Sequence, residues 1–350
     1  MKKIIALLLV LTFWAAPVLG QKGSFSEIKQ LQGPQNPRLG FVIHGGAGVI
    51  RKGSLTPERE KEYRAKLEEA LLAGYKALQA GKTSLYAVEI AIRILEDSPL
   101  FNAGKGAVFT ADGKNELDSS IMDGKTLAAG AAAGLHHVKN PITLARAIME
   151  RSPHVMMTGE GAEKFAKEQN IELVDEKYFW TQPRWDALQR ILKEEKEKAA
   201  PEKKVSLAAE EPANKFGTVG AIALDKDGNL AAGTSTGGMT NKKYGRVGDA
   251  PIIGAGTYAN NDTCAVSATG WGEFFIRLGV ARDISAMMEY RALPVQQAAD
   301  AVMGKVGKLG GDGGVIAMDK FGNIGISFNS EGMYRAYINS DGKPVVEIYK

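Results

Sequence analysis

The spacing of apolar residues along the chain predicts a mixture of buried strands and amphipathic helices. Residues 41–43 form a short unbroken apolar run, as in a buried strand, and lead into the glycine-rich stretch 44–48. A helical pattern follows, which Thr56 can cap, Pro57 can begin and Gly81 can end. These signals predict a strand, a glycine loop and a long helix in that order.

Further helices are predicted in the first half of the chain. Thr83 can cap a second helix, and shorter helical patterns cover residues 144–149 and 161–169. On the inner side of the second helix we expect Ala87, Ile90, Ala91 and Ile94.

The composition changes sharply in the middle of the chain. Residues 193–215 consist mainly of Lys, Glu, Ala and Pro, with few large apolar side chains. Such a segment cannot bury enough surface to offset the entropy lost on ordering, so we expect a flexible linker over about 193–217. A linker of this length inside a compact domain is unusual and requires an explanation.

The second half of the chain contains an internal repeat. Residues 221–230 and 315–324 share an apolar strand, a tight turn built on Asp, Gly and Asn, and a return strand. Between these two hairpins lie helical patterns near 273–290 and 295–306. This order favours two sheets covered by outer helices over an alternating parallel array of strands and helices.

Residues 1–20 have the pattern of a signal peptide. Lys2 and Lys3 precede the apolar run 4–14, and the small or modest residues 18–20 follow it. A membrane anchor is the alternative, but the run is shorter than the roughly 20 residues that a bilayer requires. We therefore expect an exported protein, periplasmic or secreted, whose mature chain starts near residue 21.

Composition and charge narrow the function classes. The net charge of +4 is too small to indicate nucleic acid or an acidic membrane surface as a partner. Cys264 is the only cysteine, so it cannot form an internal disulfide; we expect a small buried apolar residue, the alternative being a nucleophile. No histidine has a Cys, Asp or Glu at metal-ligand spacing, and no Gly-x-Ser-x-Gly motif occurs with a matching His. Zinc and serine-hydrolase chemistry are therefore not indicated.

The junction between Gly217 and Thr218 is the most informative single feature. Thr218 begins a strand directly after the charged linker. If the peptide bond before it were cut, Thr218 would carry a free α-amine, whose pKa of about 7.7–8.0 lets it act as the base for the neighbouring hydroxyl. From this residue alone an ordinary strand start is the simpler interpretation, because β-branched residues are common in strands.

Longer motifs change this interpretation. The stretch 215–261 reads KFGTVGAIALDKDGNLAAGTSTGGMTNKKYGRVGDAPIIGAGTYANN and closely resembles the plant-type asparaginase and isoaspartyl peptidase family of N-terminal nucleophile hydrolases. The resemblance includes HGGAG from residue 44, LEDSPLFNAGKGAVF from 95, ELDSSIMDG from 116 and ATGWGEFFIR from 268. It covers nearly all of the chain that follows the predicted signal peptide.

The resemblance implies an α+β fold, the four-layer αββα sandwich of the N-terminal nucleophile hydrolases. It implies self-cleavage between Gly217 and Thr218 into an α subunit, residues 21–217, and a β subunit, residues 218–350. Both subunits would form one αββα domain, and a dimer of such α–β heterodimers is expected.

The resemblance also assigns roles around the nucleophile, Thr218. Thr236 is expected to hold the new amine and the hydroxyl in position, and Asn102 and Gly46 are expected to line their surroundings. Two acidic residues of the same region, Asp118 and Asp123, look like catalytic carboxylates, but the family uses that segment structurally.

Substrate binding is assigned to four positions. Thr269 and the amide of Gly270 are expected to form the oxyanion hole and to contact the substrate. Arg246 is expected to bind the α-carboxylate of the substrate, which suits its planar guanidinium, and Asp249 the α-ammonium. Without the resemblance, Arg246 and Asp249 would more simply pair with each other across a turn.

One loop of the family binds Na⁺ through backbone carbonyls, and oxygen ligands suit such a hard cation. Lys105 stands where the family more often has an apolar residue, which leaves the last ligand of that loop open. We expect a structural Na⁺ or K⁺ and no cofactor for catalysis. The matching positions are Leu95, Glu96, Ser98, Phe101 and Ala103.

The activity implied is that of a threonine hydrolase that cleaves β-aspartyl (isoaspartyl) peptides and L-asparagine and releases L-aspartate. Its partners would be small molecules or dipeptides, with no nucleic acid and no membrane after signal removal. A glycosylasparaginase is the alternative, but that branch usually has Asp before the nucleophile, where this chain has Gly217. A second alternative is an exported amino-acid-binding protein without catalysis, although every catalytic position is filled here.

Overall fold

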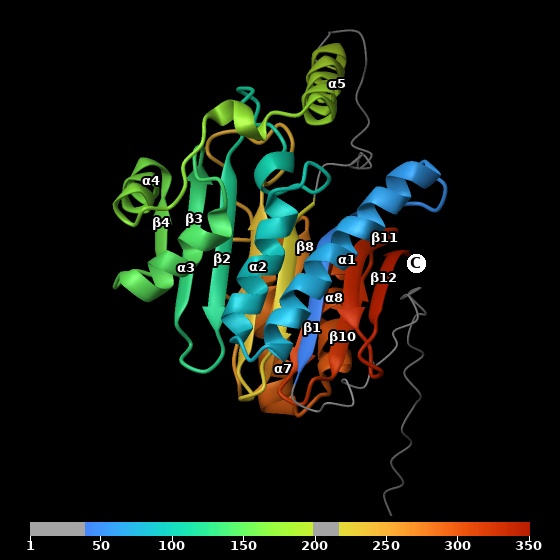
Figure 1. Ribbon diagram of the computed structural model, residues 1–350. Coiled ribbons are helices and arrows are strands. Elements are labelled where there is room, and N and C mark those ends of the chain that lie inside the picture. Colours follow the sequence, from blue (N-terminus) through green and yellow to red (C-terminus); the bar gives the residue numbers. More distant parts are fainter. Residues whose placement is uncertain (1–38, 199–216) are drawn as a thin grey trace, which may run out of the picture.

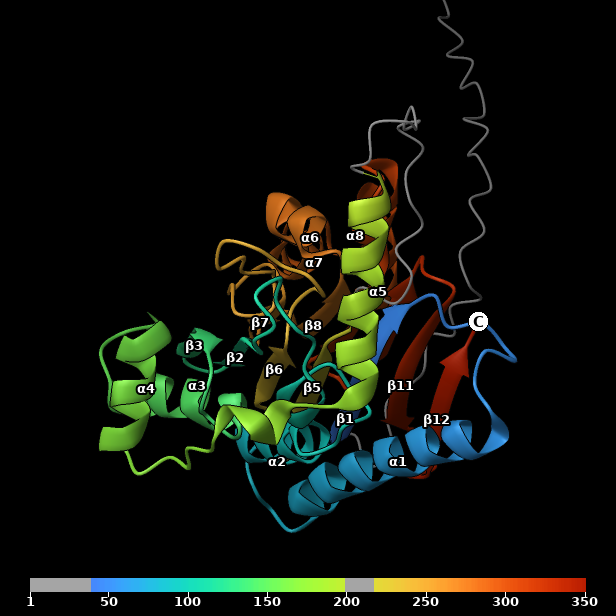
Figure 2. The same cartoon turned by 90° about the horizontal axis from the view of Figure 1, so that it is seen from above.

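Two β-sheets lie face to face at the centre of the molecule, and helices cover the outer face of each sheet (Figures 1 and 2). This computed structural model describes residues 39–198 and 217–350, so the signal-peptide prediction for residues 1–20 lies outside the described residues. The α+β fold and the αββα sandwich expected from the sequence are confirmed.

The larger sheet has eight strands in the described part of the chain, in the order β12-β11-β1-β5-β6-β2-β3-β4. Neighbouring strands are antiparallel, except that β4 runs parallel to β3. The strands are β1 (Gly40–Gly48), β2 (Leu117–Asp123), β3 (Ala129–Leu135), β4 (Met156–Thr158), β5 (Val219–Leu224), β6 (Leu230–Thr236), β11 (Gly332–Ile338) and β12 (Pro344–Tyr349).

The smaller sheet is an antiparallel set of four strands within the described residues, in the order β10-β9-β8-β7. The predicted repeat is confirmed as two hairpins, β5–β6 in one sheet and β9–β10 in the other. In both turns an aspartate, Asp225 or Asp319, accepts two backbone N–H groups at 2.8–3.0 Å, which explains the shared sequence. The strands are β7 (Thr257–Ala259), β8 (Cys264–Gly270), β9 (Gly313–Asp319) and β10 (Ile324–Phe328).

Helices form the two outer layers. In the view from above, α1 and α2 cover the larger sheet while α7 and α8 cover the smaller one (Figure 2). Thr56 and Thr83 cap α1 and α2 as predicted, because each hydroxyl accepts a backbone N–H of the first turn. The helices are α1 (Pro57–Gln79), α2 (Ser84–Glu96), α3 (Pro141–Arg151), α4 (Gly159–Glu168), α5 (Gln182–Lys198), α6 (Gly272–Leu278), α7 (Val280–Arg291) and α8 (Val295–Lys308).

Three apolar layers hold these elements together. The central layer fills the space between the sheets, and one further layer lies beneath the helices on each side. Representative buried side chains are Val42, Ile222 and Ile316 between the sheets, Phe41, Leu71 and Ile92 under α1 and α2, and Val266, Ala299 and Val302 under α7 and α8.

The buried face of α2 differs from the prediction. Ala87 and Ala91 are fully buried as expected, but Ile90 and Ile94 are only half-buried. Val88 and Ile92 point inward instead, where a Cβ added to Gly233 of β6 would lie 2.7 Å and 2.9 Å from their side chains. The missing side chain at Gly233 therefore admits these residues, a tertiary contact that helical periodicity does not reveal.

The predicted helix over 273–290 is in fact two helices. Gly279 separates α6 from α7 with φ 57° and ψ 46°, a left-handed conformation that glycine adopts without strain. The predicted helices at 144–149 and 295–306 are confirmed within α3 and α8, and the one at 161–169 is confirmed as α4, which ends one residue earlier, at Glu168.

The linker prediction is wrong for its first residues. Residues 193–198 form the last turns of α5, and residues 199–216 lie outside the described residues. Lys, Glu and Leu favour helix, and Lys193 pairs with Glu197 one turn later at 4.0 Å. Glu195 also accepts a hydrogen bond from Asn241 at 2.7 Å, which ties α5 to the loop after β6.

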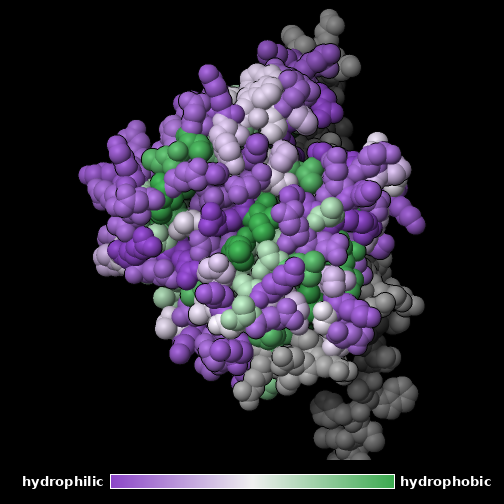
Figure 3. All heavy atoms as spheres, in the orientation of Figure 1, coloured by the Kyte–Doolittle hydropathy of each residue, from purple (hydrophilic) through white to green (hydrophobic). Residues whose placement is uncertain are grey.

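Polar side chains cover most of the face formed by α1, α2 and α3, with small separate apolar patches between them (Figure 3). Among the helices of residues 39–198 and 217–350, none combines the length and the apolar character that crossing a membrane requires.

The contact of α1 with β1 gives a stability prediction. A Cβ added to Gly74 of α1 would overlap the ring of Phe41, which is fully buried. We expect Gly74→Ala to lower the free energy of unfolding by about 1–3 kcal/mol through overpacking. The control is Gly161→Ala on α4, where the added methyl meets open space and should stabilise by up to about 1 kcal/mol. Denaturant titration measures both, and equal midpoints would contradict the assigned packing.

Candidate active site

Thr218 lies at the entry to β5, a strand near the middle of the larger sheet, and is 6% exposed. Its hydroxyl oxygen Oγ1 lies 2.7 Å from the carbonyl oxygen of Gly217 and 3.1 Å from Oγ1 of Thr236, the last residue of β6. The Gly238 backbone N–H donates to Thr236 Oγ1 at 3.0 Å, which fixes that hydroxyl. The structure therefore brings Thr218 and Thr236 together as the sequence predicted.

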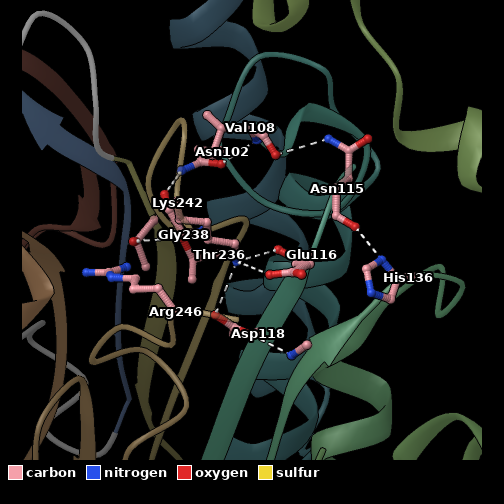
Figure 4. Close-up of polar contacts among 12 residues, drawn as sticks. Asn102, Val108, Asn115, Glu116, Asp118, His136, Thr236, Gly238, Lys242 and Arg246 are labelled. Atoms are coloured by element: carbon pink, nitrogen blue, oxygen red, sulfur yellow. Dashed lines mark hydrogen bonds and ion pairs between the residues drawn. The ribbon is translucent and has the colours of Figure 1, made fainter. Parts of the chain in front are cut away.

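The carbonyl oxygen of Gly217 sits among hydrogen-bond donors. Asn102 Nδ2 donates to it at 2.9 Å and Thr236 Oγ1 at 3.0 Å. Asn102 is itself held firmly, because its Nδ2 also donates to Gly238 O at 2.7 Å and its Oδ1 accepts the Val108 N–H at 2.9 Å. Figure 4 shows Asn102 directed toward the loop that carries Gly238, with Thr236 below it. Sequence reasoning placed Asn102 near the nucleophile but did not foresee that it faces this carbonyl.

His44 holds the other side of Thr218. Its Nδ1 lies 3.0 Å from the Thr218 carbonyl oxygen and its Nε2 lies 2.9 Å from Ser267 Oγ. A carbonyl only accepts, so Nδ1 carries the proton and Nε2 accepts from the serine hydroxyl. Burial lowers the pKa of His44 to about 3, so the ring is neutral. His44 thus links the two sheets at the nucleophile, a role that the sequence signalled only through its place before the glycine loop.

Gly46 lies against the junction, and Thr269 lies close to the same glycine-rich stretch. A Cβ added to Gly46 would lie 3.2 Å from Gly217 Cα and 3.3 Å from Thr218 N, so Gly46 lies directly against the bond between them. Thr269 precedes Gly270, the last residue of β8, and is fully buried, and its Oγ1 lies 3.4 Å from the Ala47 nitrogen. Gly46 and Asn102 therefore contact the junction from two separate segments of the chain, and Thr269 contacts the residue after Gly46.

Arg246 and Asp249, the predicted substrate-binding pair, do not form the ion pair with each other that was the simpler alternative. Instead, Nε and Nη2 of Arg246 donate to both carboxylate oxygens of Glu273 at 2.9 Å and 2.8 Å. Glu273, in the first turn of α6, was missed at the level of sequence, although it lies within the ATGWGEFFIR motif. A Cβ added to Gly272 would lie 2.8 Å from Arg246 Nη2 and 2.9 Å from Asp249 Oδ1, so both charged groups face the same bare glycine.

Asp249 is a buried carboxylate with an open position. Its Oδ2 has no hydrogen-bond partner in the described part of the chain. Burial raises the pKa of Asp249 to about 7, an effect that the charge of Arg246 partly offsets. Burying a carboxylate with an unused oxygen is costly, so this arrangement suits a ligand that brings a cationic N–H donor.

A buried ion cluster anchors the loop that carries Arg246. Lys242 is 3% exposed, and its Nζ lies 3.1 Å from Glu116 O, 3.5 Å from Glu116 Oε2 and 4.0 Å from Asp118 Oδ2. Figure 4 shows Lys242 reaching from the loop after β6 to β2. Burial raises the pKa of Asp118, and the Lys242 charge opposes that shift. Asp118 therefore helps to hold the loop that carries Lys242 and Arg246, which agrees with the structural use expected for this segment.

The loop predicted to bind Na⁺ is tightly folded around backbone carbonyls. A Cβ on Gly104 would overlap the Glu96 carbonyl oxygen, and one on Gly106 would overlap the Phe101 carbonyl oxygen. The ammonium of Lys105 lies 5.3 Å from the centre of the Tyr178 ring. Carbonyl oxygens are the donor type that Na⁺ and K⁺ prefer, so the loop fits such an ion. Within the described residues no cluster of three or more His, Cys, Asp or Glu side chains could hold a metal.

The side chain of Glu96 has a separate role. It is fully buried, and its Oε1 accepts hydrogen bonds from Ser235 Oγ at 2.6 Å and from the Ile142 N–H at 3.0 Å. Burial raises the pKa of Glu96 to about 8, which these hydrogen bonds partly oppose. Glu96 thus joins α2, the start of α3 and β6 next to Thr236.

Cys264 takes no part in this site. It lies fully buried between β8, α7 and α8, and burial raises the pKa of its thiol to about 12. The expectation of a small buried apolar residue is confirmed.

A threonine at the start of a central strand of an αββα sandwich, with a second threonine hydroxyl 3.1 Å from its own, is the arrangement of an amide hydrolase with the N-terminal nucleophile fold. Sequence comparison agrees, since the family model described as asparaginase matches residues 37–348. The chain belongs to this asparaginase family.

Curated relatives of the chain align along most of their length. The isoaspartyl peptidase of Salmonella typhimurium is 51% identical over 313 residues, which are 89% of this chain and 98% of that protein. The isoaspartyl peptidase of Escherichia coli is 50% identical over 311 residues, 89% of this chain and 96% of that protein. The plant-type L-asparaginase of Pyrococcus furiosus is 42% identical over 307 residues, 87% of this chain and 98% of that protein.

The position of Glu96 predicts how stability depends on pH. Its pKa is raised, so the folded protein keeps a proton that the unfolded chain releases between about pH 4.5 and 8. The stability from this group is therefore complete below about pH 4.5 and is lost as the pH rises to about 8. Glu96→Gln keeps the shape of the side chain without its charge. Between pH 5 and 8 the free energy of unfolding should fall in both proteins, and the fall should be smaller in Glu96→Gln by about 1–4 kcal/mol.

Denaturant titrations across that pH range test the effect. The control is Glu68→Gln, an exposed carboxylate on α1 whose removal should leave the slope unchanged. Identical pH slopes for wild type and Glu96→Gln would show that Glu96 is not protonated in the folded protein.

Proposed function

We propose that this protein cleaves itself at Gly217–Thr218 and then uses Thr218 to hydrolyse β-aspartyl (isoaspartyl) peptides and L-asparagine, releasing L-aspartate. The observation that carries the proposal is the Gly217 carbonyl, which is held by Asn102 Nδ2 and Thr236 Oγ1 within 2.7 Å of the Thr218 hydroxyl. The names of the relatives, isoaspartyl peptidase and plant-type L-asparaginase, support the substrate class.

Self-cleavage begins when Thr218 Oγ attacks the Gly217 carbonyl carbon. Negative charge develops on the carbonyl oxygen, where Asn102 and Thr236 already donate hydrogen bonds. The C–N bond breaks, the Thr218 nitrogen takes the proton, and an ester joins Gly217 to the threonine oxygen. Water then hydrolyses the ester, which leaves a carboxylate on Gly217 and a free α-amine on Thr218.

Substrate hydrolysis repeats this chemistry on an external amide. The free α-amine of Thr218 accepts the proton of its own hydroxyl as Oγ attacks the side-chain carbonyl of the aspartyl residue. Thr269 and the Gly270 amide donate to the oxygen that becomes negative. The proton passes to the leaving amine, an acyl-enzyme forms, and water releases aspartate.

Recognition of the aspartyl unit falls to the charged pair. Arg246 binds the α-carboxylate with its planar guanidinium. The substrate carboxylate thereby replaces that of Glu273, with which Arg246 is paired in this structure. Asp249 binds the α-ammonium through the oxygen that has no partner among the described residues. The two groups lie on the same side of Gly272, where even an added Cβ would lie 2.8 Å from Arg246 Nη2 and 2.9 Å from Asp249 Oδ1.

The same proposal includes a structural Na⁺ or K⁺ on the backbone carbonyls of the loop after α2. Such an ion supplies a fixed positive charge that stabilises the loop carrying Asn102. The proposed ligands are the carbonyl oxygens of Leu95, Glu96, Ser98, Phe101 and Ala103.

Export and assembly are also part of the proposal. The basic, apolar and small-residue pattern of residues 1–20 supports export, with a mature chain from about residue 21. After cleavage, residues 21–217 and 218–350 would remain one αββα domain, because β1 and β5 are paired across the cut. Two such α–β pairs would form the mature particle.

Removal of the nucleophile tests self-cleavage. Thr218→Ala should leave the chain intact on a denaturing gel and inactive, whereas the wild type gives two fragments, one beginning at Thr218. Asn102→Ala should slow cleavage by about 10²–10³-fold, because it removes one donor to the attacked carbonyl. Thr218→Ser is the control, since it keeps a hydroxyl and should still cleave. Two fragments from Thr218→Ala, identified by N-terminal sequencing, would reject the proposal.

The raised pKa of Asp249 predicts how substrate affinity depends on pH. Only the ionised carboxylate attracts an ammonium group, so affinity is complete above about pH 7 and is lost as the pH falls through that value. Calorimetry should show L-aspartate binding that weakens by up to about tenfold per pH unit below pH 7. Asp249→Asn should bind weakly at every pH, and the exposed Asp262→Asn should match the wild type. A pH-independent affinity in the wild type would contradict the role of Asp249.

A further inference from the structure

A second cavity adjoins the Gly217–Thr218 junction. It has a volume of about 180 Å³, and its described lining includes Gly217, Asn102 and the glycine-rich stretch 45–48 but not Arg246, Asp249 or Thr269. A protein cavity of about 150 Å³ is large enough to hold benzene, so this one can hold a small amino-acid moiety. The cavity is therefore separate from Arg246 and Asp249, the pair proposed to bind the aspartyl unit, yet it extends to the Gly217–Thr218 bond.

Arg184, from the first turn of α5, is the charged group in this wall. Its Nε donates to Gly106 O at 2.9 Å and its Nη2 to Leu100 O at 3.5 Å. No carboxylate among the described residues pairs with it. Burial lowers the pKa of Arg184, and no nearby carboxylate opposes that shift. A guanidinium has five N–H donors, so several remain for a ligand.

Other arginines in sheltered positions have carboxylate partners. Arg146 pairs with Glu89 and Glu150, and Arg335 pairs with Glu347. Because a desolvated cation is costly without a counter-charge, the exception at Arg184 indicates a place for an anion that no side chain of the described residues supplies.

The rest of the wall suits the body of an amino acid. The rings of Tyr63 and Tyr334 stack with centroids 4.4 Å apart and planes 12° apart, and both line the cavity. They form a flat, mainly apolar surface beside the guanidinium. An occupant with one carboxylate and a modest side chain matches this combination.

We propose that this cavity is the subsite for the leaving residue of a β-aspartyl dipeptide, and that Arg184 binds its α-carboxylate. The inference rests on the proposed function. The leaving amine lies on the far side of the attacked carbonyl from the groups that Arg246 and Asp249 bind, and its carboxylate is only two bonds from the nitrogen. L-Asparagine releases ammonia, which has no carboxylate and does not use Arg184.

Three substrates distinguish binding of the leaving carboxylate from an effect of Arg184 on all hydrolysis. They are a β-aspartyl dipeptide, the same dipeptide with a C-terminal carboxamide, and L-asparagine. Arg184→Gln should lower kcat/KM for the free-acid dipeptide by about 10- to 100-fold, mainly through KM, because a charge-assisted contact is lost. Turnover of the carboxamide and of L-asparagine should stay within about twofold, as expected where no such contact is made. Arg184→Lys should recover part of the loss, since it keeps the charge without the fork.

Arg190→Gln is the matched control, an exposed arginine on the same helix, and should change none of the three rates. An equal fall for all three substrates with Arg184→Gln would overturn the subsite, as would an unchanged rate on the free acid. If Arg184→Gln fails to self-cleave, the wild-type enzyme provides the test instead. Equal wild-type kcat/KM values for the free-acid dipeptide and for its carboxamide would overturn the proposal. A wild type that hydrolyses neither dipeptides nor L-asparagine would reject the proposed function itself.

Discussion

The contact between the Thr218 hydroxyl and the Gly217 carbonyl is the constraint on which the site depends. Three distant segments hold the residues of this contact: Asn102 from the loop after α2 and Thr236 from the end of β6 donate to the Gly217 carbonyl, and His44 from β1 donates to the Thr218 carbonyl. A donor that is already in place needs no reorganisation when charge develops, which is why fixed dipoles are effective there. The sandwich thus serves mainly to hold a few polar groups around one bond.

A chain of buried hydroxyls extends this constraint through the core. Ser267 Oγ contacts His44 Nε2 at 2.9 Å and Thr234 Oγ1 at 2.7 Å, and Thr257 joins Thr234 to Ser120. Ser120 in turn donates to the carbonyl of Ala250, the residue after Asp249. A fully satisfied buried network of this kind permits one arrangement of its members. It therefore fixes the position of the loop that carries Asp249 relative to His44 and Thr218, across both sheets.

Local signals predicted the elements well and the contacts between them less well. Caps at Thr56 and Thr83 and the repeated Asp-Gly-Asn turns depend on near neighbours, so the sequence reveals them. The side chain of Val88 points into the core because Gly233, far away in the chain, leaves space for it. The pairing of Arg246 with Glu273 depends on how α6 packs against the loop after β6. Thr218 shows the same limit, because its surroundings were predictable only through resemblance to a family.

The two charged groups proposed to bind the substrate differ in their partners among the described residues. Arg246 already has a carboxylate partner, and Glu273 is 44% exposed, so a substrate carboxylate exchanges one ion pair for another and gains little. Asp249 is 5% exposed and has an oxygen without a partner in the described residues, so an ammonium group there relieves a cost already present in the fold. In the proposed function, Arg246 therefore orients the ligand, whereas Asp249 supplies most of the discrimination in favour of a free α-amine.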